Sequence, residues 1–242
     1  MNLSTSALAG LLLCLLAPPA LAATIVGSGA SRTETRAVAG FHAIALGVDA
    51  HLEIRQGSTE SLAITGDDNI VPLVETVVEA GVLKIRWADR GSASTRYRDL
   101  AIVVDAKTLD AIALGSSGRI HAPKLTAAAF SAKVGGSGDI AIDALEADSV
   151  AATLGGSGRI VLEGRADSLE ATLSGSGNLA AGKLAARDVR ATLEGSGHAT
   201  VWAKDALRAT IAGSGEIAYY GRPRVTQTIA GSGAIRHAGD AP

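Results

Sequence analysis

The feature of this sequence that most constrains its fold is a glycine–serine motif that returns about every twenty residues. Seven serines each precede a glycine, at spacings of 20, 20, 19, 20, 18 and 18 residues, and in six of the seven a glycine also comes before the serine. Self-similarity of this period is typical of repeat proteins, in which each repeat is one small supersecondary unit. The serines are Ser117, Ser137, Ser157, Ser176, Ser196, Ser214 and Ser232.

Each repeat has the same alternation of apolar and polar side chains around its serine. The residue three positions before the serine is Leu, Val or Ile, and the residue five positions before it is usually alanine. An alternation with a period of two is typical of a half-buried strand, whereas an amphipathic helix places apolar residues three and four apart. Each unit is therefore predicted to be a strand, a glycine corner, a second strand and a turn. The residues three positions before the serines are Leu114, Val134, Leu154, Leu173, Leu193, Ile211 and Ile229.

Such a unit cannot bury its inward side chains alone, but stacked units can bury them between one another. We therefore predict an all-β, right-handed parallel β-helix in a single chain, with rungs of about 20 residues spaced ~4.8 Å apart. The repeats at residues 106–238 would form the rungs, and residues 24–105 the N-terminal β portion of the same continuous domain, 24–238.

A serine between glycines can also mark a catalytic nucleophile or a phosphate loop. A nucleophile elbow separates its serine from each glycine by one residue, and a P-loop ends in Gly-Lys-Ser/Thr. Neither pattern occurs in this sequence. Glycine instead permits positive φ and a close approach of neighbouring backbones. We predict that the motif is a repeated corner, whose serine hydroxyls bond backbone groups in their own or the next rung.

Residues 1–22 are predicted to be a signal peptide. An apolar run from Ala7 to Leu16 leads to Ala20-Leu21-Ala22, a small-x-small cleavage pattern. No Lys or Arg precedes the run, and an uncleaved membrane anchor of ~17 residues is the alternative. The only cysteine, Cys14, lies in this segment, so the mature chain is expected to lack disulfides and thiol chemistry. We expect an exported protein of the periplasm, cell envelope or exterior, with no membrane span after cleavage.

The N-terminal portion is also predicted to consist of strands. Apolar residues alternate over 44–48 and 52–54, strands follow at 62–65, 74–78 and 82–85, and Gly66–Asn69 is predicted to form an Asx-type turn. Residues 25–29 resemble an isolated first copy of the glycine corner.

The combination of segments resembles one family. The stretches TRAVAGFHAIALGVDAHLEI and GDDNIVPLVETVVEAGVLKI, followed by the repeated corners, are similar to the bacterial putative auto-transporter adhesin, head GIN domain family. The similarity extends over roughly residues 35–235, nearly all of the mature chain. It implies a secreted or envelope-associated β-helix protein, and the family name suggests adhesion. It carries over no catalytic residue.

Several outward positions are candidates for a contact surface. Threonine recurs four positions before the serine, and charged residues recur two positions after it, with opposite charges on successive rungs. The second column offers carboxylates and basic groups of the kind that β-helix enzymes use on polysaccharides, although cross-rung ion pairing is the simpler interpretation. The candidates are Thr153, Thr172, Thr192, Thr210 and Thr228; Arg119, Asp139, Arg159, Asn178, His198 and Glu216; and the aromatic cluster Trp202, Tyr219 and Tyr220.

The sequence gives little indication of a metal or a cofactor. Gly135–Asp139 begins like a calcium-binding nonapeptide repeat, but its aspartate comes one position early and the period is twenty residues instead of nine. The histidines His42, His51, His121, His198 and His237 lack paired zinc-ligand spacing. We therefore assign no catalytic, cofactor-binding or metal residues.

The favoured function is an exported, non-enzymatic protein with an adhesin-like or structural role, in contact with a cell-surface or envelope polymer or protein. The alternative is a polysaccharide-active β-helix enzyme, a lyase or a hydrolase. A net charge of −2 gives no support to nucleic-acid binding. The ends of a β-helix are open strand edges, so end-to-end association is a possibility that the sequence leaves undecided.

Overall fold

The computed structural model describes residues 25–88, 95–96 and 100–242 of the chain. This part consists of strands and one short 3-10 helix, η1 (Val71–Leu73), and contains no α-helix. The predicted signal peptide, with Cys14, lies outside the described residues.

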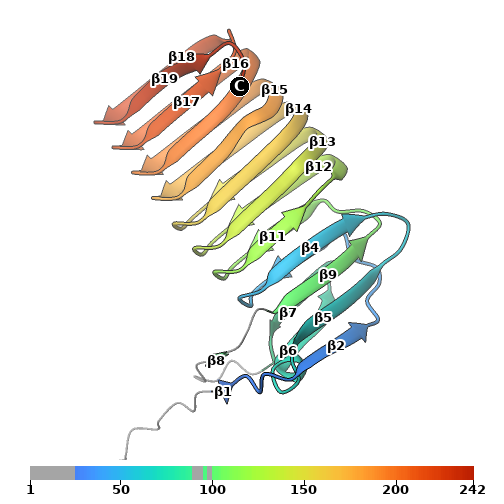
Figure 1. Cartoon of the computed structure of the whole chain (residues 1–242). Helices are drawn as coiled ribbons and strands as arrows, with labels where there is room; N and C mark the ends of the chain where they lie inside the picture. The colour runs from blue at the N-terminus through green and yellow to red at the C-terminus, as the bar shows by residue number, and fades with distance from the viewer. Residues whose placement is uncertain (1–24, 89–94, 97–99) are drawn as a thin grey trace, which may run out of the picture.

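The repeats stack into a parallel β-solenoid, which confirms the predicted fold class (Figure 1). Each rung crosses two long faces, and each strand segment pairs in parallel with the equivalent segment of the next repeat. The repeat strands are β10 (Ala111–Leu114), β11 (Arg119–Ala122), β12 (Leu125–Val134), β13 (Asp139–Leu154), β14 (Arg159–Gly175), β15 (Asn178–Gly195), β16 (His198–Gly213), β17 (Glu216–Tyr220), β18 (Arg224–Gly231) and β19 (Ala234–Gly239).

The core is a narrow channel of aliphatic side chains that runs the length of the stack. Leu154 pairs with Leu173, which pairs with Leu193, and all three are buried. The alanine row two residues earlier is buried as well, at Ala152, Ala171, Ala191 and Ala209. Alternate large and small residues thus fill a space too thin for rows of aromatic rings, which accounts for an aromatic content of only 3%.

The glycines of the corners allow neighbouring rungs to approach each other closely. A Cβ atom on Gly158 would lie 2.2 Å from the carbonyl oxygen of Gly138, and one on Gly138 would lie 2.3 Å from that of Gly118. These distances are far below van der Waals contact, so only glycine fits. The last four corners add a positive φ at the glycine before the serine, at Gly175, Gly195, Gly213 and Gly231.

The seven serines of the corners are exposed, and their role differs from the prediction. Within the described residues none of their hydroxyls has a hydrogen-bond partner in the protein, so the expected hydroxyl–backbone bonds are wrong. The corners are held by backbone bonds instead, such as Ser196 N to Gly175 O at 3.1 Å and Ser214 N to Gly195 O at 3.0 Å. The serine hydroxyls form an exposed row along one edge of the solenoid.

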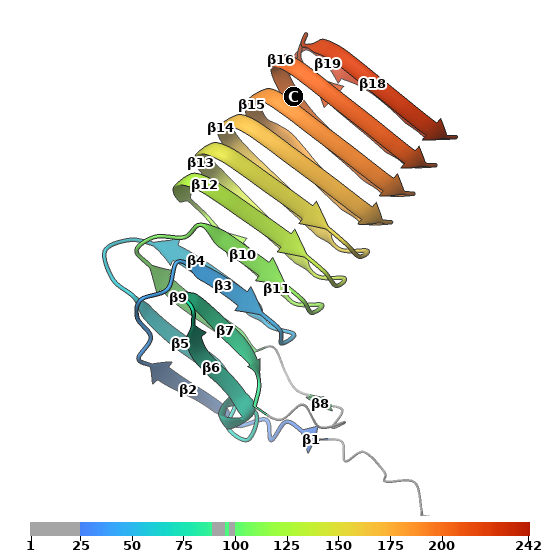
Figure 2. The same cartoon turned by 180° about the vertical axis from the view of Figure 1, so that it is seen from behind.

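The first rung in sequence does not lie at the end of the stack. It is formed by β3 (Ala43–Leu46) and β4 (His51–Gln56), which pair in parallel with β10 and β11 (Figures 1 and 2). Its corner lacks the glycine–serine motif, yet Ser116 Oγ donates to Val48 O across 68 residues at 2.8 Å. Both rungs contain the sequence Ala-Ile-Ala-Leu-Gly, at 43–47 and 111–115.

The chain then folds back to close the N-terminal end. Strands β7 (Val82–Trp87) and β9 (Ala101–Ala106) form the rung on the other side of β3 and β4. Beyond that rung lie β2 (Ser31–Arg36), β5 (Ser61–Asp67) and β6 (Val74–Glu79), all in antiparallel pairs. The Arg36 guanidinium bonds the carbonyl oxygens of Val71 and Val74, which ties β2 to η1.

The turn predicted at 66–69 lies at 67–70, since Gly66 and Asp67 end β5 and Ile70 N donates to Asp67 O at 2.9 Å, and this turn holds the N-terminal segment. Asp67 is buried and accepts from Gly29 N at 3.0 Å, while Asn69 Oδ1 accepts from Ser28 N at 2.9 Å. The glycine–serine sequence at 27–29 therefore docks on this turn and is not a member of the corner stack. The interpretation of 25–29 as a first copy of the corner is wrong. The strand before it, β1 (Ile25–Val26), pairs with β8 (Thr95–Arg96).

The C-terminal end is an open rung. Strand β18 pairs only with β16, and β19 only with β17, among the strands that the structure describes. The inward side chains Val225 and Ile229 are 40% and 42% exposed. Gln227 stands in the row that holds buried alanine in the five preceding rungs, so the last rung presents a polar group to solvent.

The close approach at the corners predicts different effects of alanine substitution at two corner glycines, Gly158 and Gly135. Gly158→Ala forces a Cβ atom against the backbone of the previous rung and should destabilise the fold by more than about 2 kcal/mol. Gly135→Ala is the matched control, because a Cβ atom there would meet nothing within 4 Å. Urea denaturation followed by circular dichroism measures both, and equal midpoints for the two variants would contradict the steric argument.

The open end predicts that one side-chain truncation has different costs in adjacent rungs. Ile211 is 0% exposed and pairs in register with Ile229, which is 42% exposed. Ile211→Ala should cost about 2–5 kcal/mol, because it leaves a cavity in the core. Ile229→Ala should cost about 1 kcal/mol, since much of that side chain already contacts water. Thermal and urea unfolding of both variants compare them, and a larger loss for Ile229→Ala would mean that the last rung is covered in solution.

Candidate functional site

The charged column that follows the serines forms as predicted. Arg119, Asp139 and Arg159 are register partners on successive rungs, and Arg119 Nη2 lies 3.6 Å from Asp139 Oδ2. At the far end of the column, Glu216 pairs with Arg236 instead of with its column neighbours. The column is therefore an exposed ion-pair surface at both ends.

The structure makes His198 and Glu216 register partners but does not bring together the two carboxylates of the enzymatic alternative. Asp139 and Glu216 are separated by four rung steps, through Arg159, Asn178 and His198. At ~4.8 Å per step this is about 19 Å along the solenoid. Glycosidase carboxylate pairs are about 5–10 Å apart, so these two carboxylates cannot act as such a pair.

The threonine column is confirmed as a continuous stack on the other long face. Thr153, Thr172, Thr192, Thr210 and Thr228 are register partners from β13 to β18. The first four are half-buried and only the last is exposed. Their position favours packing between rungs over contact with a ligand.

The aromatic residues gather near the C-terminal end of the solenoid. Trp202 and Tyr220 are register partners on adjacent rungs, and Lys204 Nζ lies 5.7 Å from the centre of the Trp202 ring. Tyr219 packs against His237, with ring centroids 5.2 Å apart. All three aromatic side chains are half-buried. They lie near the turn opposite the glycine–serine corners in the last rungs, where they pack as the packing interpretation expects.

The candidate metal ligands are dispersed. His42 lies 3.5 Å from Asp110, and His121 lies 2.8 Å from Asp143, on exposed surfaces. Asp67 and Asn69 bond the N-terminal segment. In the described ranges no three His, Cys, Asp or Glu side chains are grouped closely enough to hold a metal ion.

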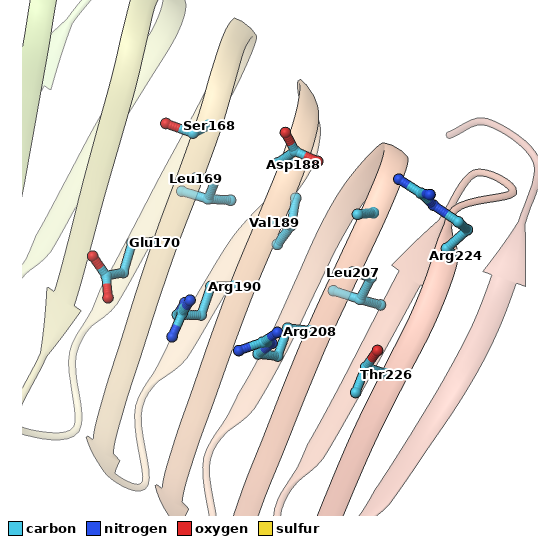
Figure 3. Close-up of a pocket in the computed structure, with 11 residues that line it drawn as sticks. Ser168, Leu169, Glu170, Asp188, Val189, Arg190, Leu207, Arg208, Arg224 and Thr226 are labelled. Carbon is cyan, nitrogen blue, oxygen red and sulfur yellow. The ribbon is translucent and has the colours of Figure 1, made fainter.

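A shallow groove on the threonine face holds a different set of charged residues. Its volume is about 540 Å³, and it lies over β14, β15, β16 and β18 (Figure 3). Two rows of outward side chains cross it from rung to rung, and all but Ala206 are exposed. The first row is Glu170, Arg190, Arg208 and Thr226, and the second is Ser168, Asp188, Ala206 and Arg224.

The arginines of this groove are not neutralised. Arg190 and Arg208 are direct register partners, so two like charges are adjacent on neighbouring rungs. Arg224 lies one rung further, two residues before the partner of Arg208. In the part of the chain that the structure describes, none of these three guanidinium groups has an ion-pair or hydrogen-bond partner. We call Arg190, Arg208 and Arg224 the arginine groove.

Several other basic groups on the solenoid are ion-paired across a rung step. Cross-rung ion pairs join Arg165 to Glu146 at 3.0 Å, Lys183 to Glu163 at 3.1 Å and Arg187 to Asp205 at 3.2 Å. Like charges in direct register are destabilising, and a surface built for stability alone would alternate them. The arginine groove is thus a place where the sequence keeps positive charge without a partner.

Sequence reasoning missed this groove. Arg190 and Arg208 were visible as the same residue at the same repeat position, six residues before Ser196 and Ser214. That coincidence in consecutive repeats was the available signal. Arg224 could be added from the same alignment, because it lies eight residues before Ser232 and therefore two residues before the register partner of Arg208.

None of the described segments forms a helix long and apolar enough to cross a membrane. Among curated proteins none matches the chain. Solved structures do match. A putative adhesin from Bacteroides fragilis superposes with a TM-score of 0.84 at 28% identity, with 88% of this chain and 99% of that one covered.

Two structures from Parabacteroides are also similar. A putative lipid binding protein from Parabacteroides distasonis gives a TM-score of 0.75 at 26% identity, with 89% of this chain and 99% of that one covered. A putative adhesin from Parabacteroides merdae has the same fold, with a TM-score of 0.70 at 24% identity over 90% and 100% of the two chains. The family described as putative auto-transporter adhesin, head GIN domain, matches residues 40–223. The resemblance found in the sequence is confirmed, and the chain belongs to this family.

Proposed function

We propose that the protein is exported and acts as a non-enzymatic, adhesin-like binding protein for a cell-surface or envelope polymer. Membership of a family described by adhesion supports this role, as does the likeness to an adhesin-named structure at 28% identity. The observation on this chain that carries the proposal is the arginine groove, because it places like charges side by side on neighbouring rungs, which costs stability unless another molecule binds them.

The solenoid gives such a surface a rigid support. The groove residues lie on strands that pair along their length with both neighbouring rungs, or with one at the open end. Binding to a preorganised surface avoids the entropy cost of ordering loops. The two rows also extend over several rungs, which suits an extended ligand better than a small one.

The arrangement of polar groups supports binding in preference to catalysis. The carboxylates that the enzymatic alternative requires are dispersed over four rung steps, and Asp139 is engaged by Arg119. The groove itself contains exposed carboxylates but is shallow and open to water. Catalysis by positioned acids and bases generally uses sites that limit the access of water.

The binding role predicts retention without turnover. The mature protein should be retained on isolated envelopes or whole cells and should release neither reducing ends nor unsaturated sugars from a glycan panel. Asp139→Ala should leave retention within about twofold of the unchanged protein, since it removes one exposed ion pair of small energetic value. Products that disappear in Asp139→Ala would establish the enzymatic alternative, and no retention on any surface would contradict the binding role.

Export predicts a defined new N-terminus. The chain recovered from the envelope or the medium should begin at Ala23 or Thr24, because the small-x-small pattern ends at Ala22. Intact mass and N-terminal sequencing measure this directly. Ala20→Arg and Ala22→Arg should block processing, with Ala9→Val as a control that keeps the apolar run. Recovery of the intact chain from Met1 would favour a membrane anchor.

A further inference from the structure

We propose that the arginine groove binds an acidic polysaccharide through its carboxylate or sulfate groups. This inference rests on the proposed binding function and names the chemistry of its ligand. The three guanidinium groups lie within two rung steps of one another, on the same outward face (Figure 3). An anion that reaches them would replace water around charges that have no partner in the described protein.

The spacing of the arginines suits a chain of anions. Arg190 and Arg208 are one rung apart, ~4.8 Å at the backbone. Arg224 is displaced by a further rung and by two residues along its strand, so the three groups form a triangle and not a line. A guanidinium presents two parallel donors to a carboxylate or sulfate, and it does so better than an ammonium group. It is consistent with this chemistry that the groove contains three arginines and no lysine.

The remaining residues of the groove fit the hydroxyl groups of a sugar. Glu170 and Asp188 can accept hydrogen bonds from hydroxyls, while Ser168 and Thr226 can both donate and accept. The two rows therefore contain both anion-binding and hydroxyl-binding groups. A polysaccharide with acidic sugars presents these two kinds of group along one chain.

The same acidic residues tell against a denser polyanion. Duplex DNA carries one negative charge per ~1.7 Å of its axis, and the Glu170 and Asp188 carboxylates would oppose its phosphates. An anionic membrane surface would meet the same two carboxylates. The net charge of the whole chain is −2, so binding of a polyanion must come from this local arrangement and not from general attraction.

The test compares two variants that remove the same charge from different places. The groove variant is Arg190→Gln, Arg208→Gln and Arg224→Gln. The control variant is Arg119→Gln, Arg165→Gln and Arg187→Gln, whose arginines are exposed but ion-paired to Asp139, Glu146 and Asp205. All six side chains are on the surface, so both proteins should fold, and circular dichroism and melting temperature verify this. Binding to polygalacturonate, dextran sulfate and neutral dextran is measured by isothermal titration calorimetry and by column retention.

We expect the unchanged protein to bind at least one of the two acidic polymers and not neutral dextran. The groove variant should bind that polymer at least about tenfold more weakly, because three charge-assisted contacts are lost. The control variant should stay within about twofold, since its arginines are already engaged. Affinity should fall as salt rises from low to physiological concentration.

Several outcomes would overturn the inference. An equal loss of affinity for the acidic polymer in the two variants would show that binding depends on net charge alone. Absence of binding to both acidic polymers would show that the groove has no such ligand. Tighter binding to duplex DNA or to vesicles of anionic phospholipid would assign it to a different class of macromolecule.

The outcome for the proposed function is separate. Equal retention of the unchanged protein and the groove variant on envelopes would reject the groove as the contact site and leave the adhesin-like role intact. Binding to an acidic polymer without any retention on cells or envelopes would reject that role and leave the groove chemistry in place.

Discussion

In-register backbone pairing between rungs is the constraint on which the rest of this structure depends. It requires that equivalent residues lie directly above one another. One substitution therefore changes the contacts with the rung before it and with the rung after it. Repeat spacings of 18, 19 and 20 residues would break this register if the difference were spread along the strands. The register shifts are instead confined to the turn opposite the glycine–serine corners, for example between Ile142 and Leu145 and between Ala181 and Ala185. The glycine corners, where backbones are closest, stay aligned.

The two ends of the stack satisfy this constraint in different ways. At the N-terminal end, antiparallel strands and η1 cover the last parallel rung, and Arg36 and Asp67 fix them with bonds to backbone groups. At the C-terminal end the rung is uncovered, and Gln227 stands in the place of the buried alanine of the five preceding rungs. Open strand edges are sites where further strands can pair, and polar residues at such edges limit that pairing. The two ends of the solenoid therefore differ: the N-terminal end is covered and the C-terminal end is open.

Much of the fold could be predicted because the same pattern of apolar residues and glycines occurs in seven repeats. The inward rows, the threonine column and the parallel register all follow from aligning the serines. The N-terminal portion could not be solved in the same way, since its strands could be located but not ordered. The pairing of β3 with β10 brings residues 43–46 beside 111–114, although about sixty residues of the chain lie between them. The shared Ala-Ile-Ala-Leu-Gly was the only local trace of it. The serine hydroxyl bonds were predicted wrongly because the backbone satisfies the corner by itself.

The arginine groove differs from the charge pairs elsewhere on the solenoid because two of its arginines are direct register partners. Glu146 with Arg165, Glu163 with Lys183 and Asp205 with Arg187 neutralise each other across single rung steps. A change of Arg208 to a carboxylate would continue that pattern, because Glu170, Arg190 and position 208 would then alternate in sign, and the exposed side chain is not needed for packing. A repeat protein can make such changes one rung at a time. Like charges in direct register are therefore better explained by a partner outside the chain than by any requirement of the fold.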